Sequence, residues 1–226
     1  MIKFRNFIRE GVDDPAIFKA VFLAGGPGSG KSFIVGKTGL PALGMKVVNS
    51  DDEFKAAMTK AGKAMTADEI FSDEGQAIRD RSKKLTGKKQ DMYVKGRLGL
   101  VIDGTGKDLD KIKKQSISLQ ALGYDTMMIL VNTTLEVAIQ RDSERDRTLG
   151  AEAVTKYWNT VQKNIGALQQ IFGKKKFIIV DNTDITKTPK ETLRAYRDVK
   201  KFVDREPENQ LAKKWIKQER EKKKRT

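Results

Sequence analysis

The segment from Gly25 to Ser32, with the sequence GGPGSGKS, is the part of the chain whose residue types and spacing most clearly specify a chemistry. It fits the pattern G-x-x-x-x-G-K-[ST] and follows an apolar run at residues 20–24. Glycines in such a loop let backbone N–H groups surround a phosphate, and the next helix presents its positive N-terminus to the same anion. The residues predicted to bind a nucleoside triphosphate here are Gly26, Pro27, Gly28, Ser29, Gly30, Lys31 and Ser32.

Lys31 and Ser32 have different expected roles within this loop. Lys31 is expected to contact the β- and γ-phosphates and so to take part in catalysis. The Ser32 hydroxyl is expected to hold Mg²⁺, a hard cation that binds hydroxyl, phosphate and water oxygens. The alternative, a chance glycine-rich turn, fits poorly with four glycines, one proline and a Lys-Ser pair at the required offset.

Two adjacent carboxylates, Asp51 and Asp52, follow the second apolar run at residues 46–50. A phosphate loop alone fits kinases, motors, GTPases and switch ATPases, and carboxylates beside the expected γ-phosphate favour a kinase. The chain has no histidine, so one of these carboxylates is the natural acceptor of a proton from a substrate hydroxyl. The alternative is that either aspartate caps the helix that follows.

Asp103 ends a third apolar run and precedes Gly104-Thr105-Gly106-Lys107. We predict that Asp103 orients Mg²⁺ through water, as the acid at this strand end does in other P-loop proteins. The glycines allow the backbone to approach a ligand closely, and Lys107 is suited to an anionic substrate. An ordinary turn capped by Asp103 is the alternative.

Three arginines stand near the end of a later helical pattern: Arg141, Arg145 and Arg147. Arg141 and Arg145 are one helical turn apart and share a face. On a lid over residues 141–150, their guanidinium groups would stabilise the charge of a phosphoryl group in transfer. The alternative is a solvated face on which these arginines pair with the carboxylates of residues 142–146.

The order of the elements predicts the fold that positions these residues. Five apolar runs alternate with helical patterns, which indicates a three-layer, doubly wound α/β fold with a mostly parallel five-stranded sheet. The active site of such a sheet lies at the C-terminal ends of its strands. The predicted strands are 19–24, 46–50, 98–103, 125–132 and 176–181. The predicted helices are 33–38, 53–62, 67–86, 109–122, 134–148 and 151–171.

Residues 1–188 are predicted to form one P-loop kinase domain, and residues 189–226 a charged helical extension. Within the domain, residues 78–97 are rich in lysine and arginine and predict an insertion that borders the substrate cleft. A solvated basic helix face is the alternative for this segment. The side chains expected to pack the extension are Leu193, Tyr196, Phe202, Leu211 and Trp215.

The composition narrows the classes of partner and compartment. The net charge is +15 over 226 residues, and only part of it lies in residues 211–226, so the body is also basic. Such a balance favours contact with nucleic acid or anionic small molecules, although solubility alone also explains the tail. The absence of cysteine excludes disulfides and cysteine-based zinc sites. No apolar run reaches membrane-spanning length, so we expect a cytoplasmic protein that is not associated with a membrane.

Over about residues 18–183 the chain resembles the zeta toxin and polynucleotide kinase-like group of P-loop kinases. The phosphate loop matches, Asp52-Glu53-Phe54-Lys55 matches the motif Asp-x-(Phe/Tyr)-Arg, and Asp103 to Lys107 matches acidic-Gly-Thr-x-Arg. The resemblance implies that Asp52 is the base and that Lys55, Thr105 and Lys107 bind the substrate. It also implies that Arg141, with Arg145 or Arg147, belongs to the lid and that Arg147 contacts the nucleotide. Asn182 is expected to lie beside the adenine.

The chain departs from the family pattern in ways that bear on the substrate. Lys55 and Lys107 replace arginines, which removes bidentate gripping of phosphate, and Asp103 stands where zeta toxins usually carry glutamate. We expect ATP and Mg²⁺ as cofactors, and a polynucleotide end or a nucleotide-like hydroxyl as acceptor because the body is basic. A nucleotide-sugar acceptor, UDP-N-acetylglucosamine, is the alternative that the resemblance implies. A third is a non-catalytic, ATP-dependent nucleic-acid-binding protein.

Overall fold

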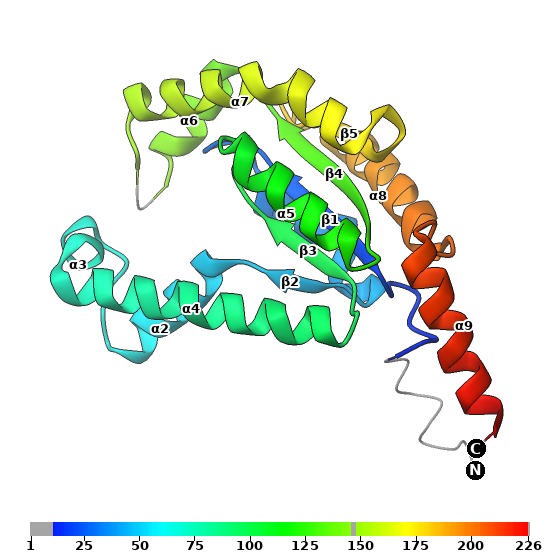
Figure 1. The fold of residues 1–226 in the computed structure, drawn as a ribbon. Helices are drawn as coiled ribbons and strands as arrows, with labels where there is room; N and C mark the ends of the chain where they lie inside the picture. Colours follow the sequence, from blue (N-terminus) through cyan, green and yellow to red (C-terminus); the bar gives the residue numbers. More distant parts are fainter. Residues whose placement is uncertain (1–10, 146–147, 226) are drawn as a thin grey trace, which may run out of the picture.

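The fold is known from a computed structural model that describes residues 11–145 and 148–225 (Figure 1). Five strands form one sheet in the order β2-β3-β1-β4-β5, and every pairing is parallel. The strands are β1 (Lys19–Ala24), β2 (Lys46–Val48), β3 (Leu100–Asp103), β4 (Asp125–Asn132) and β5 (Phe177–Asp181). The predicted α/β fold is confirmed, and the sheet is wholly rather than mostly parallel.

Helices follow the strands in the alternation that the sequence predicts. They are α1 (Lys31–Thr38), α2 (Ser50–Lys60), α3 (Ala67–Phe71), α4 (Asp73–Lys95), α5 (Leu109–Ala121), α6 (Leu135–Ser143), α7 (Ala151–Phe172), α8 (Thr188–Asp204) and α9 (Gln210–Arg225). Two short 3₁₀ helices, η2 (Leu40–Leu43) and η3 (Lys174–Lys176), complete the described elements. None of the helices within the described ranges is long and apolar enough to cross a membrane.

The sheet is covered on both faces because alternate residues of its buried strands point to opposite sides. Phe22 and Met128 belong to a cluster that includes side chains of α5, α7 and α9. Their neighbours Val21 and Ile129 belong to a second cluster, with side chains of α1 and α8. Each face therefore has its own apolar core, and Figure 1 shows α5 in front of the sheet.

The helix predicted at residues 67–86 is two helices, α3 and α4, and this corrects the sequence analysis. Ser72 ends α3 and caps α4, since its hydroxyl accepts a hydrogen bond from the Gly75 backbone N–H at 3.1 Å. A Cβ atom on Gly75 would lie 2.0 Å from the carbonyl oxygen of Glu69, so only glycine allows this close turn. Residues 78–95, the basic segment, are the continuation of α4.

The charged C-terminal region forms two helices, and its packing residues are in part those expected, since Phe202 and Trp215 pack against the core clusters. Ala195, Val199 and Val203 of α8 lie in the core cluster that includes α1. Leu193 and Leu211, which we predicted to pack, are 48% and 56% exposed. The spacing of four residues from Ala195 to Val203 defines the buried face of α8, and small and β-branched side chains occupy it.

Candidate active site

The phosphate loop connects β1 to α1 and packs closely against α6 and against Asn182, the residue that follows β5. Gly28 and Gly30 have φ angles of +73° and +83°, in the left-handed region that favours glycine. A Cβ on Gly28 would lie 2.2 Å from the carbonyl oxygen of Ala138 in α6, and one on Gly30 would lie 2.2 Å from Nδ2 of Asn182. The loop glycines are therefore required both by backbone conformation and by close packing.

Lys31 crosses this loop, and its Nζ donates a hydrogen bond to the carbonyl oxygen of Gly25 at 2.9 Å. Burial is the largest influence on Lys31 and lowers its pKa. The negative charges of Asp103 and Asp51 raise this pKa, whereas the positive charge of Arg145 lowers it further. The charged groups that act on Lys31 thus come from β3, from α2 and from the residues after α6. Ser32 is exposed in the first turn of α1.

Asp103 ends β3, directly beside β1. Its Oδ2 accepts a hydrogen bond from Nδ2 of Asn49 at 3.1 Å, while its Oδ1 is buried without a hydrogen-bond partner among the described residues. Burial raises the pKa of Asp103, Lys31 lowers it, and Asp51 and Asp52 raise it. The unpartnered Oδ1 leaves one oxygen of this carboxylate able to accept a hydrogen bond from a ligand, for example from a water of a hydrated divalent cation.

Asn49 is a site residue that the sequence analysis missed. Its Oδ1 accepts a hydrogen bond from the Asp51 backbone N–H at 2.9 Å, so Asn49 is the N-cap of α2 while its amide also holds Asp103. Asp51 and Asp52 do not cap the helix and lie exposed in its first turn. The preference of asparagine for N-caps is the signal in the sequence that could have identified this residue.

The helix that carries Asp52 is fixed to α4 by two contacts. Glu53 forms an ion pair with Lys89, and the guanidinium of Arg79 lies 4.5 Å from the ring centroid of Phe54. Lys55, which matches the arginine of the family motif, is exposed three residues after Asp52. The residues at i and i+3 of a helix share a face, so both side chains stand on the same side of α2.

The lid arginines occupy different positions. Arg141 is half-buried in α6, and its Nη1 is buried without a hydrogen-bond partner in the part of the chain that the structure describes. A Cβ placed on Gly30 would be 3.9 Å from this nitrogen, so Arg141 reaches the phosphate loop. Arg145 follows α6 and is near enough to lower the pKa of Lys31. Arg147 lies outside the described residues.

Asp142 is another residue whose role the sequence analysis missed, and it lies within the segment that was predicted to form a lid. This carboxylate is buried, and its Oδ2 accepts hydrogen bonds from the backbone N–H groups of Leu149 at 2.8 Å and Gly150 at 3.1 Å. Asp142 therefore binds backbone rather than a neighbouring arginine. The alternative of a face of local arginine–carboxylate pairs does not describe this residue.

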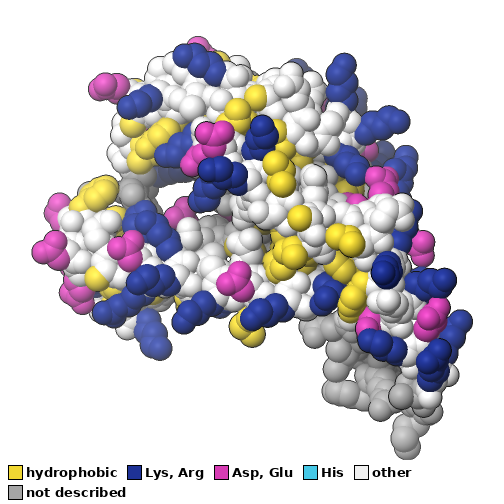
Figure 2. All heavy atoms as spheres, in the orientation of Figure 1, with side chains coloured by type: hydrophobic (Ala, Val, Ile, Leu, Met, Phe, Trp, Pro, Cys, Tyr) yellow, Lys and Arg dark blue, Asp and Glu magenta, His cyan; other side chains and the backbone are white. Residues whose placement is uncertain are grey.

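A cleft of about 440 Å³ opens beside Asp103, between α4, α5 and the ends of β2 and β3. Its polar lining comes from these side chains: Ser50, Lys83, Thr86, Gln90, Asp103, Thr105, Lys107, Asp108, Lys111 and Gln115. Apolar side chains that include Phe22, Val48 and Met128 also line it. The basic segment of α4 borders this cleft, and Figure 2 shows lysine and arginine side chains around a hollow between α3–α4 and α6–α7.

The loop that carries Thr105 and Lys107 is held by α7. Asn164 Nδ2 donates hydrogen bonds to the carbonyl oxygens of Gly106 and Lys107, each at 3.0 Å. The Nζ of Lys107 lies 4.4 Å from the ring centroid of Tyr157. Thr105 is exposed, and its carbonyl oxygen accepts a hydrogen bond from the Gly25 N–H. The two loops predicted to hold nucleotide and acceptor are thus joined directly.

Asn182 is buried after β5, and both ends of its amide are engaged. Nδ2 donates to the carbonyl oxygen of Ser29 at 2.8 Å, and Oδ1 accepts from the Thr188 hydroxyl at 2.9 Å. The side chain therefore links the phosphate loop at Ser29 to the start of α8 at Thr188.

We expect Asn182→Ala to destabilise the protein by about 1–3 kcal/mol, because the Ser29 carbonyl loses its partner, and to weaken ATP binding. Urea unfolding and nucleotide titration measure the two effects. Thr183→Ala is the matched control, since that neighbour is more exposed than Asn182. An unchanged free energy of unfolding in Asn182→Ala would contradict this supporting role.

The solved structures that resemble this chain are P-loop folds of low sequence identity. A structure of the PezAT toxin–antitoxin system of Streptococcus pneumoniae matches with a TM-score of 0.54 and 16% identity, covering 81% of this chain and 86% of that one. A gluconokinase from Sinorhizobium meliloti matches with a TM-score of 0.50 and 14% identity, covering 83% and 96%. These similarities support the fold alone.

A chain of the Pnkp1/Rnl/Hen1 RNA repair complex also matches, with a TM-score of 0.51 and 18% identity. The match covers 66% of this chain and 45% of that chain, so this chain corresponds to less than half of the repair protein.

No curated protein matches the sequence. The family model described as Zeta toxin matches residues 12–200, which include the phosphate loop, Asp52, Asp103 and the lid arginines. This match extends over most of the chain and over every element of the site. The chain therefore belongs to the zeta toxin family of P-loop kinases, which are ATP-using phosphotransferases.

Proposed function

We propose that this kinase transfers the γ-phosphoryl group of ATP to a hydroxyl of an acceptor bound in the cleft beside Asp103. The observation that carries this proposal is the position of Asp103, which lines that cleft and ends β3 directly beside β1, the strand that leads into the phosphate loop. In the reaction, an oxygen of the acceptor forms a bond to the γ-phosphorus while the bond to the β–γ bridging oxygen breaks, and ADP leaves. Asp52 accepts the proton of the attacking hydroxyl.

The donor set suits Mg²⁺, which we propose is held by the Ser32 hydroxyl and, through water, by Asp103. The buried, unpartnered Oδ1 of Asp103 fits this role. No group of three or more acidic, histidine or cysteine side chains that could hold a metal occurs within the described ranges, so hydroxyl, water and phosphate oxygens would complete the shell. When bound, Mg²⁺ neutralises charge on the β- and γ-phosphates.

Lys31, Arg141 and Arg145 are proposed to stabilise the negative charge of the phosphoryl group in transfer. Lys31 and Arg141 lie against the phosphate loop in the structure, and the unpartnered Nη1 of Arg141 is a donor available to a phosphate oxygen. Arg147 would contact the nucleotide from the same lid. Membership of a phosphotransferase family argues against a non-catalytic, ATP-dependent nucleic-acid-binding protein.

For the acceptor, we propose a polynucleotide end or a nucleotide-like hydroxyl. Three lysines of the cleft support an anionic acceptor: Lys83, Lys107 and Lys111. The basic surface around the hollow in Figure 2 gives a longer polyanion further places to bind. A nucleotide sugar, UDP-N-acetylglucosamine, is the second candidate, and the zeta toxin match over residues 12–200 favours it.

Transfer of labelled γ-phosphate from ATP tests these proposals. We would offer 5′-hydroxyl DNA and RNA, nucleosides and UDP-N-acetylglucosamine in parallel, with Lys31→Ala as the inactive control. A polynucleotide acceptor should lose affinity steeply with salt, with a logarithmic slope of about −0.7 per neutralised phosphate for single strands, whereas a nucleotide sugar should show a shallow slope. ATP binding without label in any acceptor would contradict the proposed acceptors.

A further inference from the structure

A second large cavity lies at the end of the sheet opposite to the phosphate loop. It has a volume of about 630 Å³ and is lined by the N-terminal ends of β1, β4 and β5, by η3 and by α8. We call it the basal cavity. Since β1 has six residues and rises about 3.3 Å per residue, about 20 Å of strand separates the two ends of the sheet. The basal cavity is therefore distinct from the cleft beside Asp103.

The basal cavity carries an excess of positive charge. Its seven basic side chains are Lys19, Lys174, Lys175, Lys176, Arg194, Lys201 and Arg205, and its three acidic ones are Asp125, Asp198 and Glu208. Such an excess within a concave surface raises the local concentration of anions.

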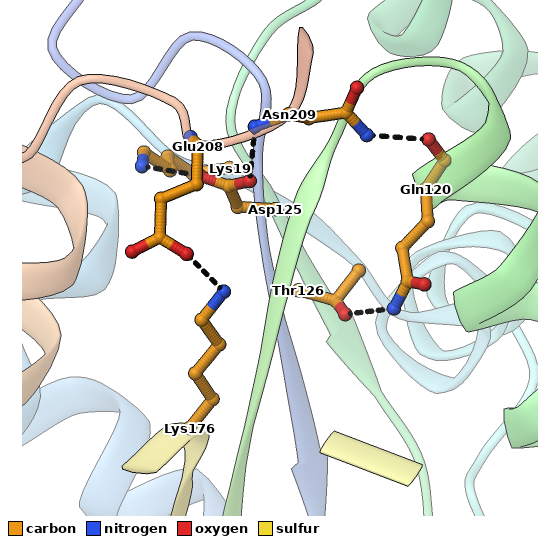
Figure 3. Close-up of polar contacts among 7 residues, drawn as sticks. All are labelled: Lys19, Gln120, Asp125, Thr126, Lys176, Glu208 and Asn209. Carbon is orange, nitrogen blue, oxygen red and sulfur yellow. Dashed lines mark hydrogen bonds and ion pairs between the residues drawn. The ribbon is translucent and has the colours of Figure 1, made fainter. Parts of the chain in front are cut away.

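Two of the three carboxylates are already compensated within the protein, as Figure 3 shows. Asp125 Oδ2 accepts a hydrogen bond from Lys19 Nζ at 2.9 Å, and the two oxygens of Asp125 also accept from the backbone N–H groups of Glu208 and Asn209. Glu208 in turn forms an ion pair with Lys176 at 2.8 Å. These carboxylates have little capacity left to neutralise the other cations.

Several cations of the cavity remain for a ligand. Lys174, Lys175 and Lys201 are exposed, and none of them forms a salt bridge with a residue in the described ranges. They stand on two elements, η3 and α8, that both line the cavity. Charge-assisted hydrogen bonds from lysines of both elements would hold a phosphate group more strongly than neutral hydrogen bonds do.

The lining also contains an apolar part. Met127, Phe177, Ile178 and Phe202 belong to it, and the Nζ of Lys19 lies 4.9 Å from the ring centroid of Phe202. A concave site of this volume, in which cations surround a small apolar part that includes the half-buried ring of Phe202, suits a compact anionic ligand with an apolar portion. We propose that the basal cavity is a second ligand site, which binds a small phosphorylated molecule that carries a ring.

Adenosine 3′,5′-bisphosphate is a suitable probe for this site. We would titrate it calorimetrically into the full chain in the presence of Mg²⁺ and a saturating non-hydrolysable ATP analogue, which occupies the phosphate loop. One further binding event per chain is expected. The double variant Lys175→Ala/Lys201→Ala should weaken it about ten-fold or more, because two charge-assisted contacts are lost.

The matched control is Lys113→Ala/Lys114→Ala, which removes the same charge from exposed positions of α5. The control should bind the probe like the unaltered protein, and thermal unfolding of both double variants checks that they are folded. Equal affinity of the two double variants for the bisphosphate would overturn the proposal. So would a titration in which the protein saturated with the ATP analogue binds no bisphosphate. Because the comparison is between variants, it remains decisive even if the ATP analogue fails to bind.

Inorganic pyrophosphate provides a further arm because it carries phosphate without a ring. We expect it to bind more weakly than the bisphosphate, and equal affinity would overturn the assignment of a ring to the apolar part of the lining. Binding of a single-stranded oligonucleotide that is lost in Lys175→Ala/Lys201→Ala, with no binding of the small probe, would replace the proposal by a nucleic-acid contact.

Discussion

Asp52→Asn is expected to lower γ-phosphoryl transfer by about 10²- to 10⁴-fold while leaving the affinity for ATP nearly unchanged, because the amide cannot accept the proton of the attacking hydroxyl. The shape and size of the side chain are conserved in this substitution. Asp52 is exposed in the first turn of α2, whose cap is Asn49, so its loss leaves the helix start intact. Single-turnover transfer and nucleotide titration measure chemistry and binding separately.

Asp51→Asn is the matched control for this prediction. It removes the same charge from the adjacent, equally exposed position of α2, and Asp51 also influences Lys31 and Asp103 through its charge. We expect a smaller loss of transfer than in Asp52→Asn. A larger loss in Asp51→Asn would exchange the two roles, and full activity in both variants would exclude either aspartate as the base.

Asp125→Ala is expected to destabilise the protein by about 3–5 kcal/mol, because it leaves a buried charge without its partner. Lys19 is only 1% exposed, and its Nζ is held by Asp125 at 2.9 Å. Burial lowers the pKa of Lys19, and its hydrogen bond to Asp125 opposes that effect. The substitution also removes the acceptor of the backbone N–H groups of Glu208 and Asn209, between α8 and α9.

Urea unfolding measures this loss, and a double variant separates its causes. Lys19→Met/Asp125→Ala removes both charges, so we expect it to be more stable than Asp125→Ala alone. The loss of unfolding free energy that remains in the double variant measures the effect of leaving the N–H groups of Glu208 and Asn209 without their acceptor. An unfolding midpoint of Asp125→Ala equal to that of the unaltered protein would refute the importance of this buried pair.

The sequence predicts the sheet well because its central strands are buried on both faces. β4, for example, contains a continuous apolar run from Met127 to Val131, and it forms at the predicted bounds. Helix boundaries are harder, because they depend on single polar side chains. Asn49 caps the start of α2 and Ser72 caps the start of α4. Apolar periodicity contains no information about the positions of these caps.

The site was predictable where its residues occur in one short segment, and less so where distant segments meet. The phosphate loop and the two aspartates after β2 could be read from local spacing. The contact of Asn182 with Ser29 joins residues 153 positions apart, and that of Lys107 with Tyr157 joins α7 to the loop after β3. Only the packed fold places such side chains together, so their supporting roles were not accessible from the pattern.

The two hydrogen bonds from Leu149 and Gly150 to Asp142 have a consequence for the position of Arg141. They join the residues directly before α7 to α6, and Arg141 is the neighbour of Asp142 in α6. We therefore expect Arg141 to keep its place against the phosphate loop when a nucleotide binds, so that this guanidinium is a preorganised donor and no ordering cost is paid for it on binding.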